Sequence, residues 1–166
     1  ADQPQVTVSA DGTRAVSVWT RWNGSHYIIQ ARTSINSGAT WSAPVDLSAA
    51  GQSASYPQVA GSADGSKLTS VWRRSDGDNW IIQASTSSNS GATWSAPVDL
   101  SAAGQSAFYP QVTGSADGTR LTSVWVRYDG SNDIIQAATG KIAPTPAGMF
   151  YVIPNREGGG AVIYLE

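Results

Sequence analysis

Arginine, aspartate and aromatic residues recur in three short polar segments, residues 21–27, 74–80 and 127–133, at a spacing of 53 residues. Guanidinium forks bond hydroxyls or carboxylates, and aromatic rings stack on the apolar faces of sugars. These residue types indicate carbohydrate recognition, although variable polar loops can also be unconstrained surface. The candidate ligand-binding residues are Arg21, Trp22, Tyr27, Arg74, Asp76, Trp80, Arg127, Tyr128 and Asp129.

Carboxylates suited to acid–base catalysis are scarce. Glycosidases generally use two carboxyl groups at a set separation, and the only glutamates are Glu157 and Glu166, outside the recurring segments. Most aspartates are explained by tight turns. His26 is the single histidine and cysteine is absent, so neither a histidine-based nor a thiolate metal site is expected. We therefore expect no catalytic residues, no metal site, no cofactor and no enzymatic activity.

The composition argues against two classes of partner. Ten Lys and Arg stand against 12 Asp and Glu, giving a net charge of −2, and no basic run suggests contacts with a nucleic-acid backbone. No apolar stretch approaches the length of a membrane span. Ala1 rather than Met opens the sequence, as after removal of an export signal, and a truncated sequence would look the same. We expect a secreted or extracellular protein.

The sequence consists of three copies of one unit. Pro4-Gln5-Val6 recurs at 57–59 and at 110–112, and residues 36–54 recur unchanged at 89–107. Each copy has two Asp-Gly or Asn-Gly pairs between apolar or β-branched runs, which is typical of tight β-hairpins. These pairs predict three antiparallel strands in each copy.

A fourth strand is expected at residues 41–47 and again at 94–100. A single four-stranded sheet of this size exposes both faces and must stack on its neighbours. Radial stacking produces the blades of a β-propeller. The predicted fold is an all-β propeller with three four-stranded antiparallel repeats of 53 residues, nearly without helices.

The third turn of each of the first two copies carries a known pattern. Residues 34–41 and 87–94 follow Ser-x-Asn-x-Gly-x-Thr-Trp, which resembles the Asp-box, or BNR, repeat of sialidases and related propellers, with Asn in place of Asp. The resemblance covers roughly residues 4–139. It implies a structural role for Ser34, Asn36, Gly38, Thr40, Trp41, Ser87, Asn89, Gly91, Thr93 and Trp94.

The same resemblance implies where a ligand binds. Ligands of such propellers meet the face opposite the boxes, where the second-to-third-strand turns and the linkers between blades lie. Residues 52–56 and 105–109 are such linkers, and Tyr56 and Tyr109 either pack there or direct their hydroxyls to a ligand. Arg21, Arg74 and Arg127 invite comparison with the arginine triad of sialidases. Because the repeat places one on each blade, we do not expect them to converge on one carboxylate.

The copies define the domain organisation. Blades are expected at about 4–56, 57–109 and, in part, 110–139, and residues 140–166 contain two strand candidates that form a C-terminal hairpin completing or capping the last blade. Three blades do not easily close a ring. We therefore expect a homodimer that completes a six-bladed ring. A fragment, an engineered chain or a recent amplification would show the same repeats.

These expectations leave three functions in order. The first is a non-catalytic propeller that binds glycans in the manner of a lectin, through the second-to-third-strand turns and inter-blade loops. The second is a structural scaffold, designed or amplified, without a ligand. The third is a sialidase-like glycoside hydrolase, which the missing glutamates disfavour.

Overall fold

The computed structural model describes residues 1–141, and within this range every regular element is a β-strand. The first sheet contains β1 (Asp2–Val8), β2 (Ala15–Trp22), β3 (Tyr27–Ser34) and β4 (Val45–Asp46). The second contains β5 (Ala54–Gly61), β6 (Leu68–Ser75), β7 (Trp80–Ser87) and β8 (Val98–Asp99). The third contains β9 (Ala107–Gly114), β10 (Arg120–Tyr128) and β11 (Asp133–Lys141).

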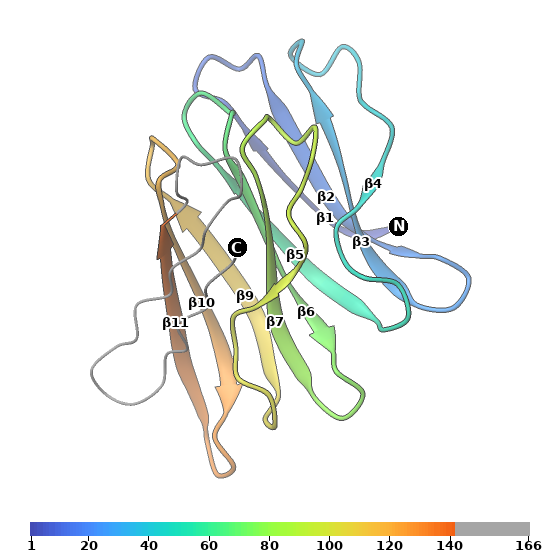
Figure 1. Cartoon of the computed structure of the whole chain (residues 1–166), viewed down its shortest axis with the longest axis vertical. Coiled ribbons are helices and arrows are strands. Elements are labelled where there is room, and N and C mark those ends of the chain that lie inside the picture. The colour runs from blue at the N-terminus through green and yellow to red at the C-terminus, as the bar shows by residue number, and fades with distance from the viewer. Residues whose placement is uncertain (142–166) are drawn as a thin grey trace.

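All strand pairs are antiparallel and follow chain order within each sheet. Figure 1 shows the three sheets side by side. The all-β architecture and the repeated antiparallel sheets confirm the coarse prediction, although residues 1–141 do not close a ring. Within this range no helix is long and apolar enough to cross a membrane.

The fourth strands are much shorter than predicted. Pairing is confined to Val45–Asp46 and Val98–Asp99, instead of 41–47 and 94–100. Pro44 and Pro97 immediately precede these pairs, and proline has no N–H for a strand ladder. The third sheet has three strands in the described range, and β11 extends to Lys141. The remainder of the expected C-terminal hairpin, 142–166, lies outside the described residues.

The first strand of each sheet contains an irregularity at the same repeat position. Gln3, Tyr56 and Tyr109 adopt φ angles of 53°, 56° and 52°, each directly before a proline. The pairing register of β1 and β5 shifts at this point. A left-handed residue costs about 1–3 kcal/mol where the surroundings hold it. This feature redirects the chain where the linker enters each new sheet.

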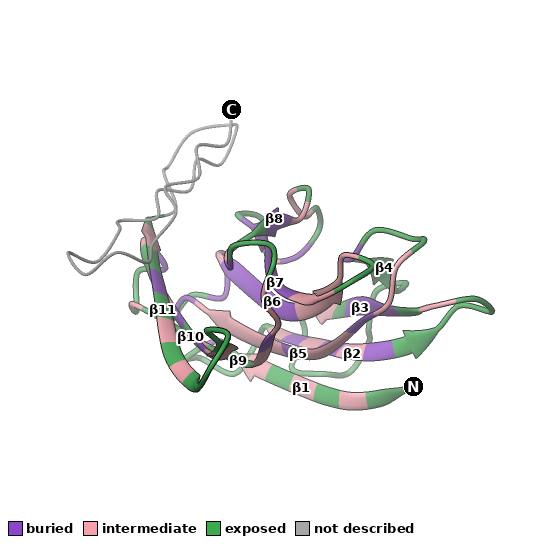
Figure 2. Ribbon diagram, turned by 90° about the horizontal axis from the view of Figure 1, so that it is seen from below, coloured by how far each residue is buried: buried purple, intermediate pink, exposed green. Residues whose placement is uncertain are grey.

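The core lies between the sheets, as the buried residues in Figure 2 indicate. One cluster joins Val18 and Ile29 of the first sheet to Leu68 and Trp72 of the second, and Trp72 is fully buried. Two further clusters join the second and third sheets. Apolar burial between sheets therefore stabilises the stack, because each sheet covers a face of the next.

Candidate functional site

A cleft of about 770 Å³ lies at the end of the first two sheets where the β2–β3 and β6–β7 hairpins project. Its wall combines both hairpins with the linker that enters β5. The lining residues are Asp2, Gln3, Thr20, His26, Tyr27, Gly51, Gln52, Ser53, Ser55, Tyr56, Arg73, Ser75, Gly77 and Trp80. The turns and the linker thus share one face, as the sequence predicted.

Arg73 is the principal charged group of this cleft. Its guanidinium carbon lies 4.3 Å from the ring centroid of Tyr56 and 4.3 Å from that of Trp80. Its Nε donates a hydrogen bond of 2.9 Å to Ser55 Oγ. Burial lowers the pKa of the Arg73 guanidinium, and Tyr56 and Tyr109 act in the opposite direction. Arginine nevertheless stays protonated at neutral pH, so the cleft contains a fixed, half-buried cation.

The sequence analysis did not select Arg73. It emphasised Arg21, Arg74 and Arg127, which recur at every copy, whereas Arg73 stands where the first copy has Thr20 and the third has Val126. The usable signal was the departure from the repeat. A single arginine at a position that is otherwise small or apolar marks the second blade as different.

Aromatic residues extend the cleft on both sides. Tyr27 and Trp80, both predicted from sequence, line it, and the rings of Trp22 and Tyr27 meet edge to face with centroids 5.1 Å apart. Trp22 and Tyr27 are each about half exposed. Tyr56 also meets Tyr109 edge to face, at 5.6 Å. The cleft therefore offers a cation flanked by accessible ring surface.

Two predicted acidic residues are engaged in their own turns. Asp76 Oδ1 accepts hydrogen bonds from the N–H groups of Asp78 (3.0 Å) and Asn79 (2.7 Å). Asp129 does the same with Ser131 (2.8 Å) and Asn132 (2.7 Å). These backbone hydrogen bonds lower the pKa of both carboxyls. Both carboxylates thus support hairpins and are not among the residues lining the cleft.

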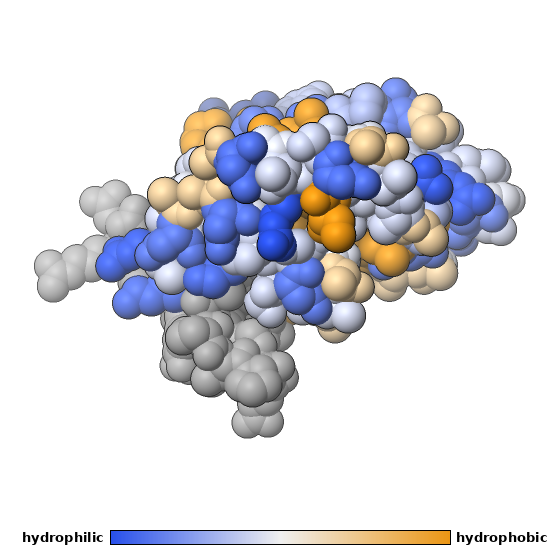
Figure 3. Space-filling model, turned by 90° about the horizontal axis from the view of Figure 1, so that it is seen from above, coloured by the Kyte–Doolittle hydropathy of each residue, from blue (hydrophilic) through white to orange (hydrophobic). Residues whose placement is uncertain are grey.

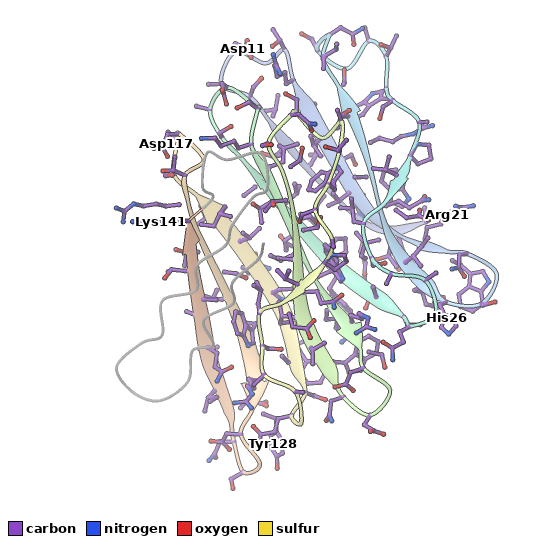
Figure 4. All side chains as sticks on the ribbon, viewed as in Figure 1. Asp11, Arg21, His26, Asp117, Tyr128 and Lys141 are labelled. Atoms are coloured by element: carbon purple, nitrogen blue, oxygen red, sulfur yellow. The ribbon has the colours of Figure 1, made fainter. Side chains whose placement is uncertain are left out.

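The remaining candidates are spread along the repeat and lie outside the cleft lining. Arg21 is exposed, whereas Arg74 and Arg127 are partly buried with Nε atoms that have no hydrogen-bond partner. Tyr128 donates a hydrogen bond of 2.9 Å to the carbonyl of Gly130 at the tip of the third sheet. Figure 4 shows Arg21 and Tyr128 on different sheets. The structure does not bring the three repeated arginines together at this site.

The Ser-x-Asn-x-Gly-x-Thr turns have closed hydrogen-bond networks. Asn36 Oδ1 accepts from Ser34 Oγ (3.0 Å) and from Thr40 N–H (2.9 Å), and its Nδ2 donates to Thr40 Oγ1 (2.8 Å). Ser34 Oγ in turn accepts from Gly38 N–H (2.9 Å). The second copy repeats this network through Ser87, Asn89, Gly91 and Thr93. Trp94 packs against the core, whereas Trp41 is exposed.

The opposite end of the sheets carries the Asp-Gly hairpins. Asp11 Oδ1 accepts from Ser9 Oγ (2.6 Å) and from Thr13 N–H (3.0 Å), and Asp117 makes the equivalent contacts. These bonds lower the pKa of each carboxyl to about 2. Asp11 and Asp117 lie far from Tyr128 in Figure 4. Figure 3 views this end, where hydrophilic and hydrophobic residues are interspersed.

The chemistry available in the cleft is that of binding. Asp2 is the one carboxylate among its lining residues, and residues 1–141 contain no group of three or more His, Cys, Asp or Glu placed to hold a metal ion. Glu157 and Glu166 lie outside the described residues. A cation, several hydroxyls and amides, and rings are suited to hold a polar ligand with an apolar face.

Comparison with known proteins identifies the fold. No protein-family model matches the sequence, and no curated protein matches it. Among solved structures, Hadza microbial sialidase Hz136 is similar with a TM-score of 0.58 and 13% identity, over 98% of this chain and 46% of that chain. Trypanosoma rangeli sialidase in complex with the inhibitor DANA gives a TM-score of 0.47 and 12% identity, over 98% and 37%.

The chain therefore spans less than half the length of these sialidases. At 13% identity the likeness to the microbial sialidase shows the fold alone. The protein is an all-β chain with a sialidase-like β-propeller fold.

Proposed function

We propose that this chain is a non-catalytic carbohydrate-binding module of the lectin type, and that the cleft between its first two sheets is the binding site. The observation that carries this proposal is the Arg73 guanidinium, held between the rings of Tyr56 and Trp80 in the wall of a 770 Å³ cleft. The aromatic contacts fix the planar fork in place. A pre-organised fork loses little freedom when it bonds hydroxyls or a carboxylate.

The neighbouring groups suit a sugar. The half-exposed ring of Tyr27 provides an apolar platform, and the polar groups of Gln52, Ser53 and Ser55 lie along the same wall. Sugars present apolar ring faces together with dense hydroxyls, so a site for them combines both kinds of surface. The proposed ligand-binding residues are thus Arg73, Tyr27 and Trp80, with Tyr56 as support.

Binding without turnover follows from the acidic groups. A retaining or inverting glycosidase needs two carboxyls on opposite sides of the scissile bond. Asp76 and Asp129 are engaged by their own hairpins, and Asp2 is a single carboxylate at the edge of the cleft. We therefore keep hydrolysis as the least supported alternative. It would be recognised by release of a reporter group from a sialoside.

A glycan array that displays neutral and acidic oligosaccharides tests the proposal. The full chain should bind a subset of the array, and Arg73→Ala should reduce that binding at least tenfold. Arg120→Ala is the matched control, because Arg120 is exposed at the start of β10, at the opposite end of the sheets. A folded protein that binds no glycan, or one for which both substitutions act alike, would contradict the proposal.

A scaffold without ligand is the second candidate function. It is favoured by one observation, namely that Asn23, Asp76 and Asp129 spend their side-chain oxygens on their own turns in all three copies. The scaffold predicts that substitutions of Tyr27 or Arg73 change stability alone. The array experiment separates the two, because it reads binding in a protein whose folding is checked by circular dichroism.

The finer features of the fold belong to the same proposal. Residues 34–41 and 87–94 act as Asp boxes with Asn replacing Asp, supported by their closed hydrogen-bond networks. Two chains complete a six-bladed ring, which is consistent with a chain that covers 46% of the sialidase Hz136. Such a module is secreted or extracellular, where glycans are accessible. A monomeric mass at all concentrations would contradict the ring.

A further inference from the structure

The boundary between neighbouring sheets is built in the same way twice. Val59 of the second sheet packs against the cluster that includes Val18 and Ile29 of the first. Val112 of the third sheet packs in the same way against Val71 and Ala84 of the second. Each sheet thus has a leading face, which covers the sheet before it, and a trailing face, which receives the sheet after it.

The leading face of the first sheet is open. It consists of Pro4, Val6 and Trp19, at the repeat positions that make contact in the other sheets. Val6 is 66% exposed, and Pro4 is also exposed. The residues at the equivalent positions of Pro4 and Trp19 are buried: Pro57, Pro110, Trp72 and Trp125. Trp19 itself is only partly buried.

The trailing face of the third sheet is open as well. It consists of Val124, Ile135 and Ala137, all exposed, with Ile135 at 73%. The equivalent residues of the first two sheets are buried between sheets: Val18, Ile29, Ala31, Val71, Ile82 and Ala84. The chain therefore ends, at its two sides, in the two halves of one repeated boundary.

A backbone series has the same polarity. Ala10 N–H donates to the carbonyl of Ala63, and Ala63 N–H donates to the carbonyl of Ala116, each at 2.7 Å. Another boundary of this kind would join Ala116 N–H to the Ala10 carbonyl of a further copy. The polar contact and the apolar faces thus specify the same direction of stacking.

Glycines at one hairpin position report how closely the sheets approach. A Cβ atom at Gly65 would lie 2.9 Å from Arg14 Cβ of the sheet before, and one at Gly118 would lie 2.8 Å from Ser62 Cβ. At Gly12, the equivalent position of the first sheet, nothing lies within 4 Å. Gly12 therefore leaves room for the close approach that the other two glycines already have.

We propose that the leading face of the first sheet binds the trailing face of the third sheet of a second copy of this chain, head to tail. A second copy is the occupant because it carries both halves of a boundary that the chain already forms twice. Two such contacts close a cyclic dimer of six sheets. This inference rests on the ring proposed above and assigns its contact surfaces.

Two residues of the leading face differ from their equivalents and set the strength of the contact. Val8 stands where the other sheets have Gly61 and Gly114, and Arg32 stands where they have buried Ser85 and Ala138. Both are larger, so the new boundary packs less closely than the internal ones. We accordingly expect a reversible dimer, whose mass depends on concentration.

Light scattering and sedimentation of the full chain test the inference. The unmodified chain should reach twice its mass of 17.3 kDa as its concentration rises. Val6→Asp and Ile135→Asp should each shift the midpoint of association at least tenfold toward higher concentration, because each places a charge in one half of the contact. Both side chains are exposed in the single chain, so folding should be retained. Ile35→Asp, in the turn after β3 at 72% exposure, is the matched control and should associate normally.

Mixing the two variants establishes the polarity. In a head-to-tail contact, Val6→Asp retains an intact trailing face and Ile135→Asp an intact leading face, so an equimolar mixture should form a dimer through one contact. A monomer throughout, a dimer that neither variant weakens, or variants that do not associate on mixing would each overturn the inference. Glycan binding is read separately on the same samples, because the cleft lies within one chain.

Discussion

The guanidinium of Arg73 lies against the indole of Trp80, with its Cζ atom 4.3 Å from the ring centroid. Tyr56 contacts the same guanidinium at the same distance. Tyr56 occupies this position because its φ of 56° redirects the chain just before Pro57. A backbone irregularity shared by the repeats is thus combined with one arginine that the repeats do not share. The combination makes the second blade the specialised one.

Replacing Arg73 by Val, the residue of the third copy at this position, should separate binding from stability. A partly buried cation–π contact contributes about 1 kcal/mol, and up to ~2 kcal/mol when desolvated. We expect Arg73→Val to lower the free energy of unfolding by about 1 kcal/mol in urea titrations and to abolish glycan binding. Retention of full affinity would show that the guanidinium has no role in recognition.

Asn89 should tolerate aspartate better than alanine. Its Oδ1 accepts hydrogen bonds from Ser87 Oγ and Thr93 N–H, and its Nδ2 donates to Thr93 Oγ1. Aspartate keeps both acceptors, and the Thr93 hydroxyl can rotate to donate. Alanine removes all three bonds, at about 0.5–1.5 kcal/mol each. In thermal unfolding, Asn89→Ala should lower Tm clearly and Asn89→Asp should change it little. Equal losses would remove the basis for an Asp-box-like role.

The repeat made most of the fold predictable from sequence. Pairs such as Asp64-Gly65 determine where hairpins turn, because Gly65 adopts a φ of 67° that other residues avoid. Apolar residues alternate with polar ones along β2, which places Val16 and Val18 on one face. The fourth strands were overestimated because Trp41 and Thr40 have high strand propensity. Pro44 and the closed turn of Asn36 restrict pairing to two residues.

The site was only half predictable for a different reason. Residue type alone suggested Asp76 and Asp129 as ligand groups, yet their oxygens bond backbone N–H groups within two or three residues. Arg73 becomes visible only when strand order places it beside the linker residue Tyr56. The sequence pattern identifies the face of a ligand site, whereas the contacts between linker and strand select its members.

The Asp-Gly hairpins should weaken in acid. Hydrogen bonds from Ser115 Oγ and from Thr119 lower the pKa of Asp117 to about 2, from the usual 3.8. Because the folded-state pKa is depressed, the stabilisation is fully present above about pH 4 and is lost as pH falls through about 2. Carboxyl NMR titration should give the low pKa, and thermal unfolding between pH 2 and 6 the loss of stability. Asp117→Asn should flatten this pH dependence, and an NMR pKa near 4 would contradict it.

Gly91 and Gly38 form a matched pair that measures how strongly the sheets depend on close stacking. Both adopt left-handed conformations, with φ of 81° and 83°, so alanine costs about 1–2 kcal/mol at either position. A Cβ atom at Gly91 would overlap Thr33 Cγ2 of the first sheet and lie 3.3 Å from Leu68 Cδ1, whereas at Gly38 nothing lies within 4 Å. Overpacking adds about 1–3 kcal/mol.

Gly91→Ala should therefore unfold at a clearly lower urea midpoint than Gly38→Ala, with the difference attributable to the boundary between the first two sheets. Thr33→Ser removes the obstructing methyl group and should recover part of the loss in the double variant with Gly91→Ala, while leaving Gly38→Ala unchanged. Coincident midpoints for the two alanine variants would mean that the sheets separate readily at this point, which would place the stability of the stack in its apolar clusters alone.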